Sequence, residues 1–211
     1  MSMSEHPDVA FLTMAYRPID TMRAIIGAKQ QLHIGKKTIY LLHQKPFPRR
    51  MEQYPDITIK QFNVEGKWPQ LWYKKLMRFF DACTEEYFVW WDEDDRFENE
   101  YVSKALALPL TGCCPLVWNY EMVMVRGNSL NPGRYRSAIG TLAGRVDVAR
   151  DMARLIKPEG DNAKDCQFRK LLAKRMTIGN HNGMRYYIHH KNSHTTRFTN
   201  TGRVKGEDVD A

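Results

Sequence analysis

The stretch YFVWWDEDDRFENEYV, residues 87–102, begins as an apolar run of strand length and then breaks into four consecutive acids. These acids are Asp92, Glu93, Asp94 and Asp95, in a chain whose formal net charge is +8. Neighbouring carboxylates repel one another, and the repulsion costs more free energy where solvent is partly excluded. The pattern therefore indicates a compensating cation at the end of a buried strand. A solvated acidic turn is the simpler alternative.

The spacing of the acids suits a hard divalent cation. Asp92 and Asp94 lie on the same side of an extended chain, and carboxylate oxygens are preferred ligands of Mg²⁺ and Mn²⁺, which commonly also bind phosphates. A solvated turn would give no reason for the apolar run before it. Ligands of open α/β sheets bind beyond the carboxyl ends of the strands, so we expect a metal and phosphate site here.

Strand and helix patterns alternate before this stretch. Apolar runs at 8–15, 37–42 and 57–62 predict strands, and residues at helical spacing follow Pro18 and fill 68–83. This β-α-β rhythm predicts a parallel sheet. The simplest interpretation of the aromatic stripe in 68–83 is core packing.

The pattern changes in the second half of the chain. Residues 119–145 read as two strands joined around the turn signal Asn-Pro-Gly at 131–133, so we expect the sheet to become antiparallel there. Residues 146–156 and 161–176 have helical spacing. We expect one domain with halves at 8–95 and 96–198 and a flexible tail at 199–211; a family resemblance in the acidic stretch implies that the first half is the nucleotide-binding half and the second the acceptor half.

Composition bounds the class of protein. The chain has 211 residues, of which 43% are hydrophobic, enough for one packed domain. The four cysteines show no zinc-finger spacing and no disulfide framework. No signal peptide and no apolar run of membrane-spanning length stands out, so we expect a cytoplasmic protein. The excess positive charge makes an anionic partner plausible.

The segment VWWDEDDRFENEYV, residues 89–102, resembles the D-x-D region of the GT-A glycosyltransferases, especially glycosyltransferase family 2. The resemblance implies an α/β fold of the Rossmann-like nucleotide-diphospho-sugar transferase type, with a mixed sheet flanked by helices. In that family the motif holds a divalent metal, Mn²⁺ or Mg²⁺, that bridges the diphosphate of a nucleotide-sugar. Carried over here, Asp92 and Asp94 become metal ligands and Asp95 a further one. Asp92 and Glu93 also count as donor contacts.

The segment FLTMAYRP, residues 11–18, resembles the first strand of the family and the loop that receives the nucleotide. The implied donor contacts are Thr13, Ala15, Tyr16 and Arg17. Tyr16 would stack on a base and Arg17 would pair with a phosphate. At the second strand many members carry an Asp that reads uracil, whereas this chain has His43 and Gln44. A UDP-sugar is the expected donor, but this departure leaves the nucleotide open.

The segment EGDNAKDCQFRKLL, residues 159–172, resembles the helix that supplies the catalytic base of inverting members. Asp165 is the closer match and Asp161 the second choice. The alternative interpretation is that Asp161 caps the helix and that Asp165 only faces the helix dipole. Many GT-A enzymes also supply a metal ligand from the C-terminal part of the chain, where His190 and His194 are the candidates, with His189 beside them.

The acceptor is the least constrained part of the prediction. Locally basic groups, among them Lys74, Lys75 and Arg78, would give sequence-independent affinity for nucleic acid, although a solvated cationic surface explains each group equally well. By analogy with phage-encoded glycosyltransferases, a hydroxymethylated base in DNA is a candidate acceptor, flipped into the site and contacted by the segment 128–136. A cell-surface glycan or lipid-linked sugar is the competing acceptor.

Two other classes of enzyme would use the same acids. A metal-dependent nuclease would need no sugar-nucleotide pocket. A nucleotidyltransferase should show a Gly-rich phosphate loop near its first strand, and the segment 11–18 has none. The oligomeric state is left open by the sequence.

Overall fold

The computed structural model describes residues 7–33, 35–44, 56–67, 70–93, 95–106, 116–118, 120–126, 129–135, 142–157, 164–173, 178–180 and 185–189. Within these ranges no helix is long and apolar enough to cross a lipid bilayer.

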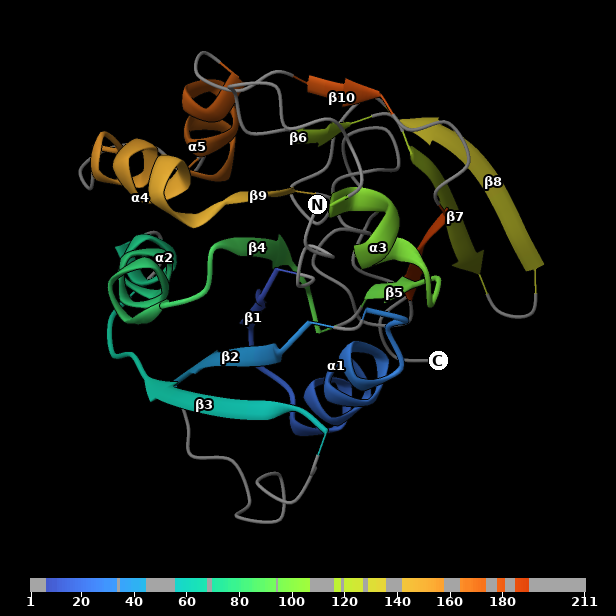
Figure 1. The fold of residues 1–211 in the computed structure, drawn as a ribbon, viewed down its shortest axis with the longest axis horizontal. Coiled ribbons are helices and arrows are strands. Elements are labelled where there is room, and N and C mark those ends of the chain that lie inside the picture. Colours follow the sequence, from blue (N-terminus) through green and yellow to red (C-terminus); the bar gives the residue numbers. More distant parts are fainter. Residues whose placement is uncertain are drawn as a thin grey trace, which may run out of the picture.

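A five-stranded sheet forms the centre of the molecule (Figure 1). Its strands, in spatial order, are β3 (Thr58–Asn63), β2 (Lys37–His43), β1 (Val9–Met14), β4 (Tyr87–Trp90) and β9 (Ala143–Arg145). The first four run parallel, and β9 pairs antiparallel with β4. The strands predicted at 8–15, 37–42, 57–62 and 87–91 are all present. The carboxyl ends of β1, β2 and β4 therefore meet at one edge.

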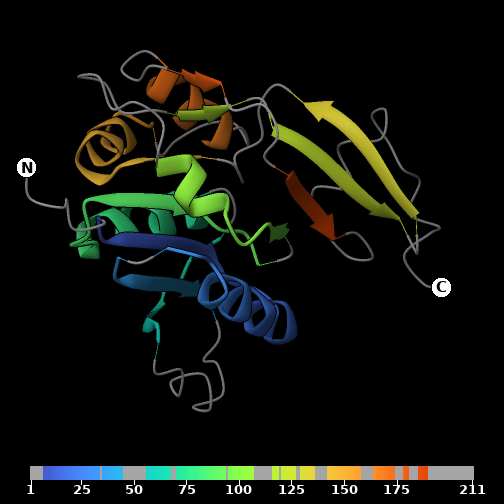
Figure 2. The ribbon, with the colours of Figure 1, turned by 45° about the vertical axis from the view of Figure 1, so that its right-hand side comes forward.

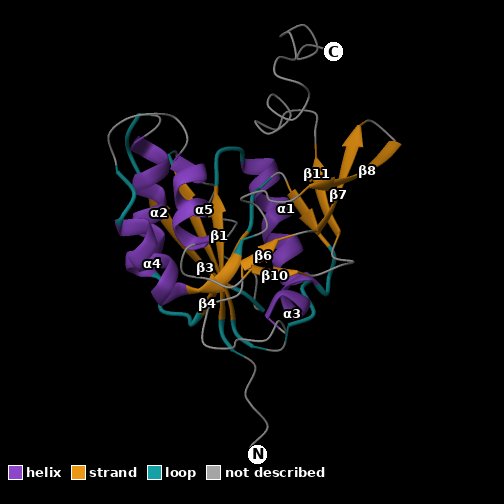
Figure 3. Cartoon of the chain, turned by 90° about the horizontal axis from the view of Figure 1, so that it is seen from above, coloured by secondary structure: helices purple, strands orange, loops and turns teal. Residues whose placement is uncertain are grey.

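Helices cover both faces of this sheet (Figure 3). One face packs against α1 (Pro18–Lys29) and α3 (Tyr101–Leu106). The other packs against α2 (Gln70–Ala82), α4 (Val146–Arg154) and α5 (Lys164–Ala173). Helical spacing explains the first helix, because Pro18 has the fixed φ of a first turn and the side chains at 21, 24, 25 and 28 form its buried stripe.

The strand β4 is buried on both sides, as its continuous apolar run predicts. Side chains alternate along an extended chain, so Trp90 packs into the core beneath α2 and Trp91 into the core beneath α1. Trp90 stacks on Trp72 with ring centroids 5.7 Å apart. The indole nitrogen of Trp91 donates to the Ala24 carbonyl oxygen at 3.0 Å. Each buried ring removes on the order of 200 Å² from water, which stabilises the fold by roughly 5 kcal/mol.

Close packing fixes the position of α1 against this strand. A Cβ at Gly27 would lie 3.3 Å from the Trp91 ring, so the helix approaches the indole closely only because this residue has no side chain. On the other face, the Arg150 guanidinium of α4 donates to the carbonyl oxygens of Phe80 and Cys83 at 2.7 and 2.9 Å. These bonds satisfy carbonyls at the C-terminal end of α2.

A second sheet lies beside the first (Figure 2). Its order is β5 (Asp95–Phe97), β11 (Arg185–His189), β7 (Tyr120–Arg126) and β8 (Ser129–Tyr135), and a separate parallel pair joins β6 (Leu116–Trp118) to β10 (Ile178–Asn180). The prediction of antiparallel pairing in this part of the chain is confirmed for β7 and β8.

The turn predicted at 131–133 is wrong. Arg126 pairs with Ser129, so the chain reverses between these two residues, and Pro132 lies inside β8 opposite Val123. The Gly-Asn pair at 127–128 is itself a two-residue hairpin signal in the sequence. Pro132 is tolerated because β8 is the outer strand of the described sheet and needs no donor on that side. The segment proposed to contact DNA is therefore largely strand rather than loop.

Candidate active site

The predicted donor residues gather at the carboxyl edge of the central sheet. Because β1 lies between β2 and β4, the segments that follow these three strands are neighbours. The Ala15 amide donates to the Leu42 carbonyl oxygen at 3.0 Å, and the Trp91 amide donates to the Leu12 carbonyl oxygen at 2.8 Å. The predicted residues Thr13, Ala15, Tyr16, Arg17, His43, Asp92 and Glu93 are thereby brought to one edge.

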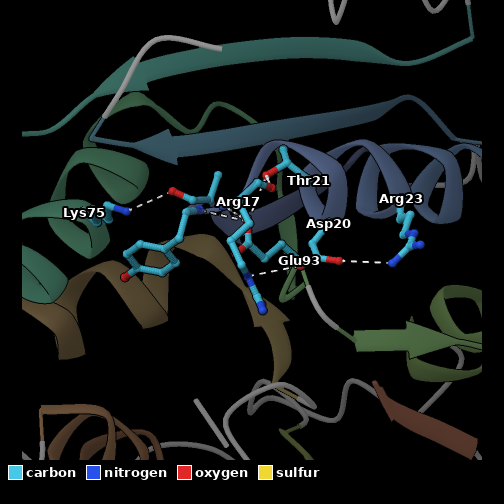
Figure 4. A network of polar contacts seen from close by, with 8 residues as sticks. Arg17, Asp20, Thr21, Arg23, Lys75 and Glu93 are labelled. Carbon is cyan, nitrogen blue, oxygen red and sulfur yellow. Dashed lines mark hydrogen bonds and ion pairs between the residues drawn. The ribbon is translucent and has the colours of Figure 1, made fainter. Parts of the chain in front are cut away.

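Glu93 anchors the loop between β1 and α1, residues 15–17. Its side chain is 3% exposed. Oε2 accepts hydrogen bonds from the backbone amides of Tyr16 and Arg17 at 2.8 and 3.0 Å and from the Thr21 hydroxyl at 2.8 Å. Oε1 accepts one from Arg17 Nε at 3.1 Å. Figure 4 shows these groups converging on the carboxylate.

This carboxylate also acts as the cap of α1. Arg17 occupies the N-cap position in extended conformation and makes no side-chain cap bond. The first amides of a helix lack partners within the helix, and negative charge at this end is favoured by the helix dipole. Glu93, 76 residues away in the sequence, supplies the acceptor for the N-cap amide of Arg17 and the negative charge at this end.

The Arg17 guanidinium is partly committed to protein carboxylates. Its Nε lies 3.1 Å from Glu93 Oε1 and 3.1 Å from Asp20 Oδ2. Asp20 also accepts a hydrogen bond from Arg23 at 3.3 Å. The predicted phosphate contact of Arg17 stays a prediction, and it would have to come from a guanidinium whose Nε side is already occupied.

Lys75 is a site residue that the sequence reasoning missed. It is fully buried, its ammonium donates to the Ala15 carbonyl oxygen at 3.3 Å, and it lies 3.7 Å from the centre of the Tyr16 ring. Burial lowers the pKa of Lys75 to about 8, against the opposing effect of the Glu93 charge. The sequence does contain the signal, because Leu71, Lys75 and Phe79 share one stripe of the helix at four-residue spacing.

Tyr16 is held by this ammonium but remains 45% exposed. Desolvation raises the pKa of Tyr16 above its ordinary value of 10, and the charges of Asp92 and Glu93 raise it further. The phenol is therefore neutral at physiological pH. An exposed aromatic ring beside two acids is suited to stacking on a planar group.

Asp92 is partly buried and oriented by the residue two positions before it. Its Oδ1 accepts a hydrogen bond from the Trp90 indole nitrogen at 2.8 Å. A fixed carboxylate at a strand end has the oxygen chemistry that Mg²⁺ and Mn²⁺ prefer. No group of three His, Cys, Asp or Glu side chains that could hold a metal occurs among the described residues.

For the other predicted metal ligands and both predicted bases, either the residue or its side chain lies outside the part of the chain that the structure describes. Asp94, Asp161, His190 and His194 fall outside the described residues. Asp95 begins β5 and Asp165 lies in the first turn of α5, but their side chains are outside the described part. The predicted metal set and the predicted general base therefore stay predictions.

Thr13 and His43 lie on neighbouring strands at the same edge. Thr13 is fully buried, and within the described part of the chain its hydroxyl has no hydrogen-bond partner. His43 is 6% exposed, and its backbone carbonyl accepts from the Val64 amide at 2.8 Å. The Gln44 side chain donates to the Gly66 carbonyl oxygen at 3.2 Å. The predicted roles of Thr13 and His43 in donor binding are untested.

A second buried acid lies at the opposite end of β4. Glu85 accepts hydrogen bonds from the Tyr40 hydroxyl at 2.6 Å and from the Thr84 amide at 3.1 Å, and Lys60 donates to the same hydroxyl at 2.7 Å. Burial alone would raise the pKa of Glu85, but hydrogen bonds from Tyr40 and neighbouring donors outweigh it and hold the pKa at about 2. This cluster stabilises the amino edge of the sheet, away from the loop at 15–17.

No protein-family model and no curated protein sequence matches the chain. Solved structures do resemble it. The S. aureus TarS 1-349 structure has a TM-score of 0.62 at 14% identity, over 85% of this chain and 60% of that one. Its complex with UDP-GlcNAc has a TM-score of 0.62 at 13% identity, over 96% and 63%. The mannosyltransferase PcManGT from Pyrobaculum calidifontis, in complex with GDP-Man and Mn²⁺, has a TM-score of 0.60 at 11% identity, over 88% and 58%.

These likenesses establish the fold. The chain has the mixed α/β GT-A architecture that its D-x-D region predicted, with a mixed sheet flanked by helices. It spans about 60% of the length of these structures.

Proposed function

We propose that the protein is a metal-dependent glycosyltransferase that moves a sugar from a nucleotide-sugar donor to a hydroxyl acceptor. The observation that carries the proposal is the fixed loop at 15–17 beside Asp92, at the carboxyl edge of a GT-A sheet. Structures of similar fold hold UDP-GlcNAc in one case and GDP-Man with Mn²⁺ in another. These ligands support a nucleotide-sugar donor at this edge.

The residues that would hold Mn²⁺ or Mg²⁺ are Asp92 and Asp94, with Asp95 and either His190 or His194 as further ligands. When bound, the cation supplies positive charge to the departing diphosphate. Asp92 is suited to this role because the Trp90 indole holds one of its oxygens and leaves the group only partly buried. Thr13, Ala15, Tyr16, Arg17 and His43 would form the nucleotide pocket.

Tyr16 would orient the base of the donor. Lys75 fixes its ring from one side, so the ring is held in place before the donor arrives. An aromatic ring stacks on any base, so this contact does not choose the nucleotide. With His43 at the position where related enzymes carry an Asp, the choice between a uracil and another base stays open, and a UDP-sugar is the first donor to test.

Asp165, or Asp161 in its place, would take the proton of the acceptor hydroxyl. The oxygen then attacks the anomeric carbon, the bond from that carbon to the diphosphate oxygen breaks, and the nucleoside diphosphate leaves with the electron pair. This single displacement inverts the anomeric configuration. A product that retains the configuration of the donor would remove the role of Asp165 and Asp161.

For the acceptor we propose a hydroxymethylated base in DNA, of the kind that phage enzymes glycosylate, reached within the cytoplasm. The net charge of +8 supports a polyanionic acceptor, because phosphate contacts give affinity without sequence preference. Lys74 and Arg78 are exposed on α2 and belong to this positive charge. A cell-surface glycan is the acceptor to set against it.

A donor and acceptor screen tests the proposal. The protein is incubated with Mn²⁺ and a panel of UDP- and GDP-sugars, together with hydroxymethylated DNA or glycan acceptors, and products are identified by mass spectrometry. Release of a nucleoside diphosphate with addition of one sugar mass to an acceptor is expected. Metal-dependent cutting of plasmid DNA without sugar transfer would support the nuclease instead and overturn the proposal.

A further inference from the structure

We infer that Glu93 is a positioning residue for the nucleotide donor. Its carboxylate sets the conformation of the loop at 15–17 and does not bind the metal. The inference rests on the proposed function, because it assigns this loop to donor binding. It gives Glu93 a different role from Asp92 and Asp94, its neighbours in the acidic stretch, which are the proposed metal ligands.

The hydrogen bonds and the burial of Glu93 leave little of its carboxylate open to a cation. A carboxylate offers about four lone-pair sites. Oε2 already accepts from Tyr16, Arg17 and Thr21, and Oε1 from Arg17 Nε. The side chain is only 3% exposed, so an ion approaching from solvent would have to displace these donors. Asp92, one residue earlier, points to the other side of the chain, toward Trp90.

Glu93 and Lys75 hold successive peptide groups of the loop from two directions. The Ala15 carbonyl oxygen accepts from Lys75 on α2, and the next two amides, of Tyr16 and Arg17, donate to Glu93 (Figure 4). The backbone between the end of β1 and the start of α1 is thus fixed at consecutive positions. This fixes the direction of the Tyr16 ring, which Lys75 contacts at 3.7 Å.

A loop that is ordered before the donor binds costs less free energy to order during binding. Without the Glu93 carboxylate, the amides of Tyr16 and Arg17 lose this acceptor and Arg17 Nε loses one of its carboxylate partners. The loop is then free to leave the conformation that presents Tyr16. Donor affinity should fall while the chemical step, carried by the metal ligands and the general base, is preserved at saturating donor. A purely structural role would lower stability without changing the donor affinity of the folded protein.

The test measures nucleotide and metal binding separately in Glu93→Gln. Isothermal titration with UDP and with GDP, in the presence of Mn²⁺, should show about tenfold weaker binding than wild type. Titration with Mn²⁺ alone, followed by electron paramagnetic resonance, should give unchanged affinity. In the donor screen, KM for the donor should rise by about tenfold with kcat within about threefold of wild type.

Glu85→Gln is the matched control. Glu85 is also a buried acid beside β4 that accepts several hydrogen bonds, but it lies at the opposite edge of the sheet. Its nucleotide affinity should stay within about twofold of wild type even where its thermal stability falls. Thr21→Val removes one donor to Glu93 with little change in volume, and we expect a loss of about threefold in nucleotide affinity. This variant decides the matter if Glu93→Gln does not fold.

The outcomes are distinct. Unchanged nucleotide affinity in Glu93→Gln, or in Thr21→Val where the first variant does not fold, overturns the positioning role. Loss of Mn²⁺ affinity in Glu93→Gln makes Glu93 a ligand and also overturns it. If the wild-type protein binds neither UDP nor GDP with Mn²⁺, the proposed function fails and the inference fails with it.

Discussion

The buried ammonium of Lys75 makes a quantitative prediction about stability against pH. The residue has no exposed surface, and burial lowers its pKa from 10.5 to about 8. Below pH 8 the lysine is protonated in both the folded and the unfolded chain, so folding bears the full cost of burying the charge. Between pH 8 and 10.5 the folded protein has released the proton while the unfolded chain still binds it. The free energy of unfolding therefore gains a term that rises with pH.

The size of this term follows from the two pKa values. Their difference corresponds to about 3 kcal/mol in total, of which about 2 kcal/mol falls between pH 7 and pH 9.5. Lys75→Met keeps the buried alkyl chain and removes the charge, so the term disappears. The difference in unfolding free energy between wild type and Lys75→Met should therefore shift by about 2 kcal/mol in favour of wild type over this interval.

Urea unfolding at pH 7 and pH 9.5 measures this shift directly. Subtracting the two proteins at each pH cancels the titration of all other groups. Lys74→Met is the control, because Lys74 is exposed one position earlier on the same helix. If the unfolding free energies of wild type and Lys75→Met change in parallel with pH, within about 0.5 kcal/mol, the buried ammonium beside Tyr16 is refuted.

Three further predictions concern the metal ligand, the core and the thiol. Asp92→Asn should abolish Mn²⁺-dependent nucleotide binding in calorimetry yet leave the urea midpoint almost unchanged, because an amide oxygen still accepts from the Trp90 indole; retained binding would remove Asp92 from the site. Phe168→Ala should lower the unfolding free energy by about 3 kcal/mol, since its ring is fully buried against Phe80, and a loss below about 1 kcal/mol would contradict that packing. Burial raises the pKa of Cys83 to about 12, so its thiol should react slowly with iodoacetamide at pH 8. Peptide mass spectrometry should find Cys83 unalkylated until urea is added, and rapid labelling of the native protein would count against its burial.

The sequence predicted the central sheet because its strands carry strong local signals. The run at 87–91 is apolar at every position, which is the pattern of a strand covered on both faces, and the pair Trp90 and Trp91 fills the two cores accordingly. The parallel order of β1, β2 and β4 then brings the segments that follow them to one edge without any further information. The loop at 15–17 and Asp92 could therefore be predicted as neighbours.

Contacts between distant segments limited the prediction of the site. The N-terminal end of α1 is capped by the Glu93 carboxylate, 76 residues away in the sequence. Capping rules use only the residues next to a helix, so they could not predict this contact. Glu93 is predicted as a donor contact from its place in the acidic stretch, and its bonds to the amides of the loop at 15–17 join segments far apart in the sequence. Lys75 was grouped with Lys74 and Arg78 because the three cations lie close together in the sequence. That grouping does not consider the buried helical stripe that Lys75 shares with Leu71. The turn predicted at 131–133 was wrong because the sequence contains two turn signals close together, Gly-Asn at 127–128 and Asn-Pro-Gly at 131–133.

The most direct test of the account is a crystal structure grown with Mn²⁺ and a nucleotide-sugar. We predict an anomalous peak for manganese beside the Asp92 carboxylate, with the diphosphate between that ion and the loop at 15–17. Manganese bound elsewhere, or a nucleotide bound away from the carboxyl edge of β1 and β4, would contradict it.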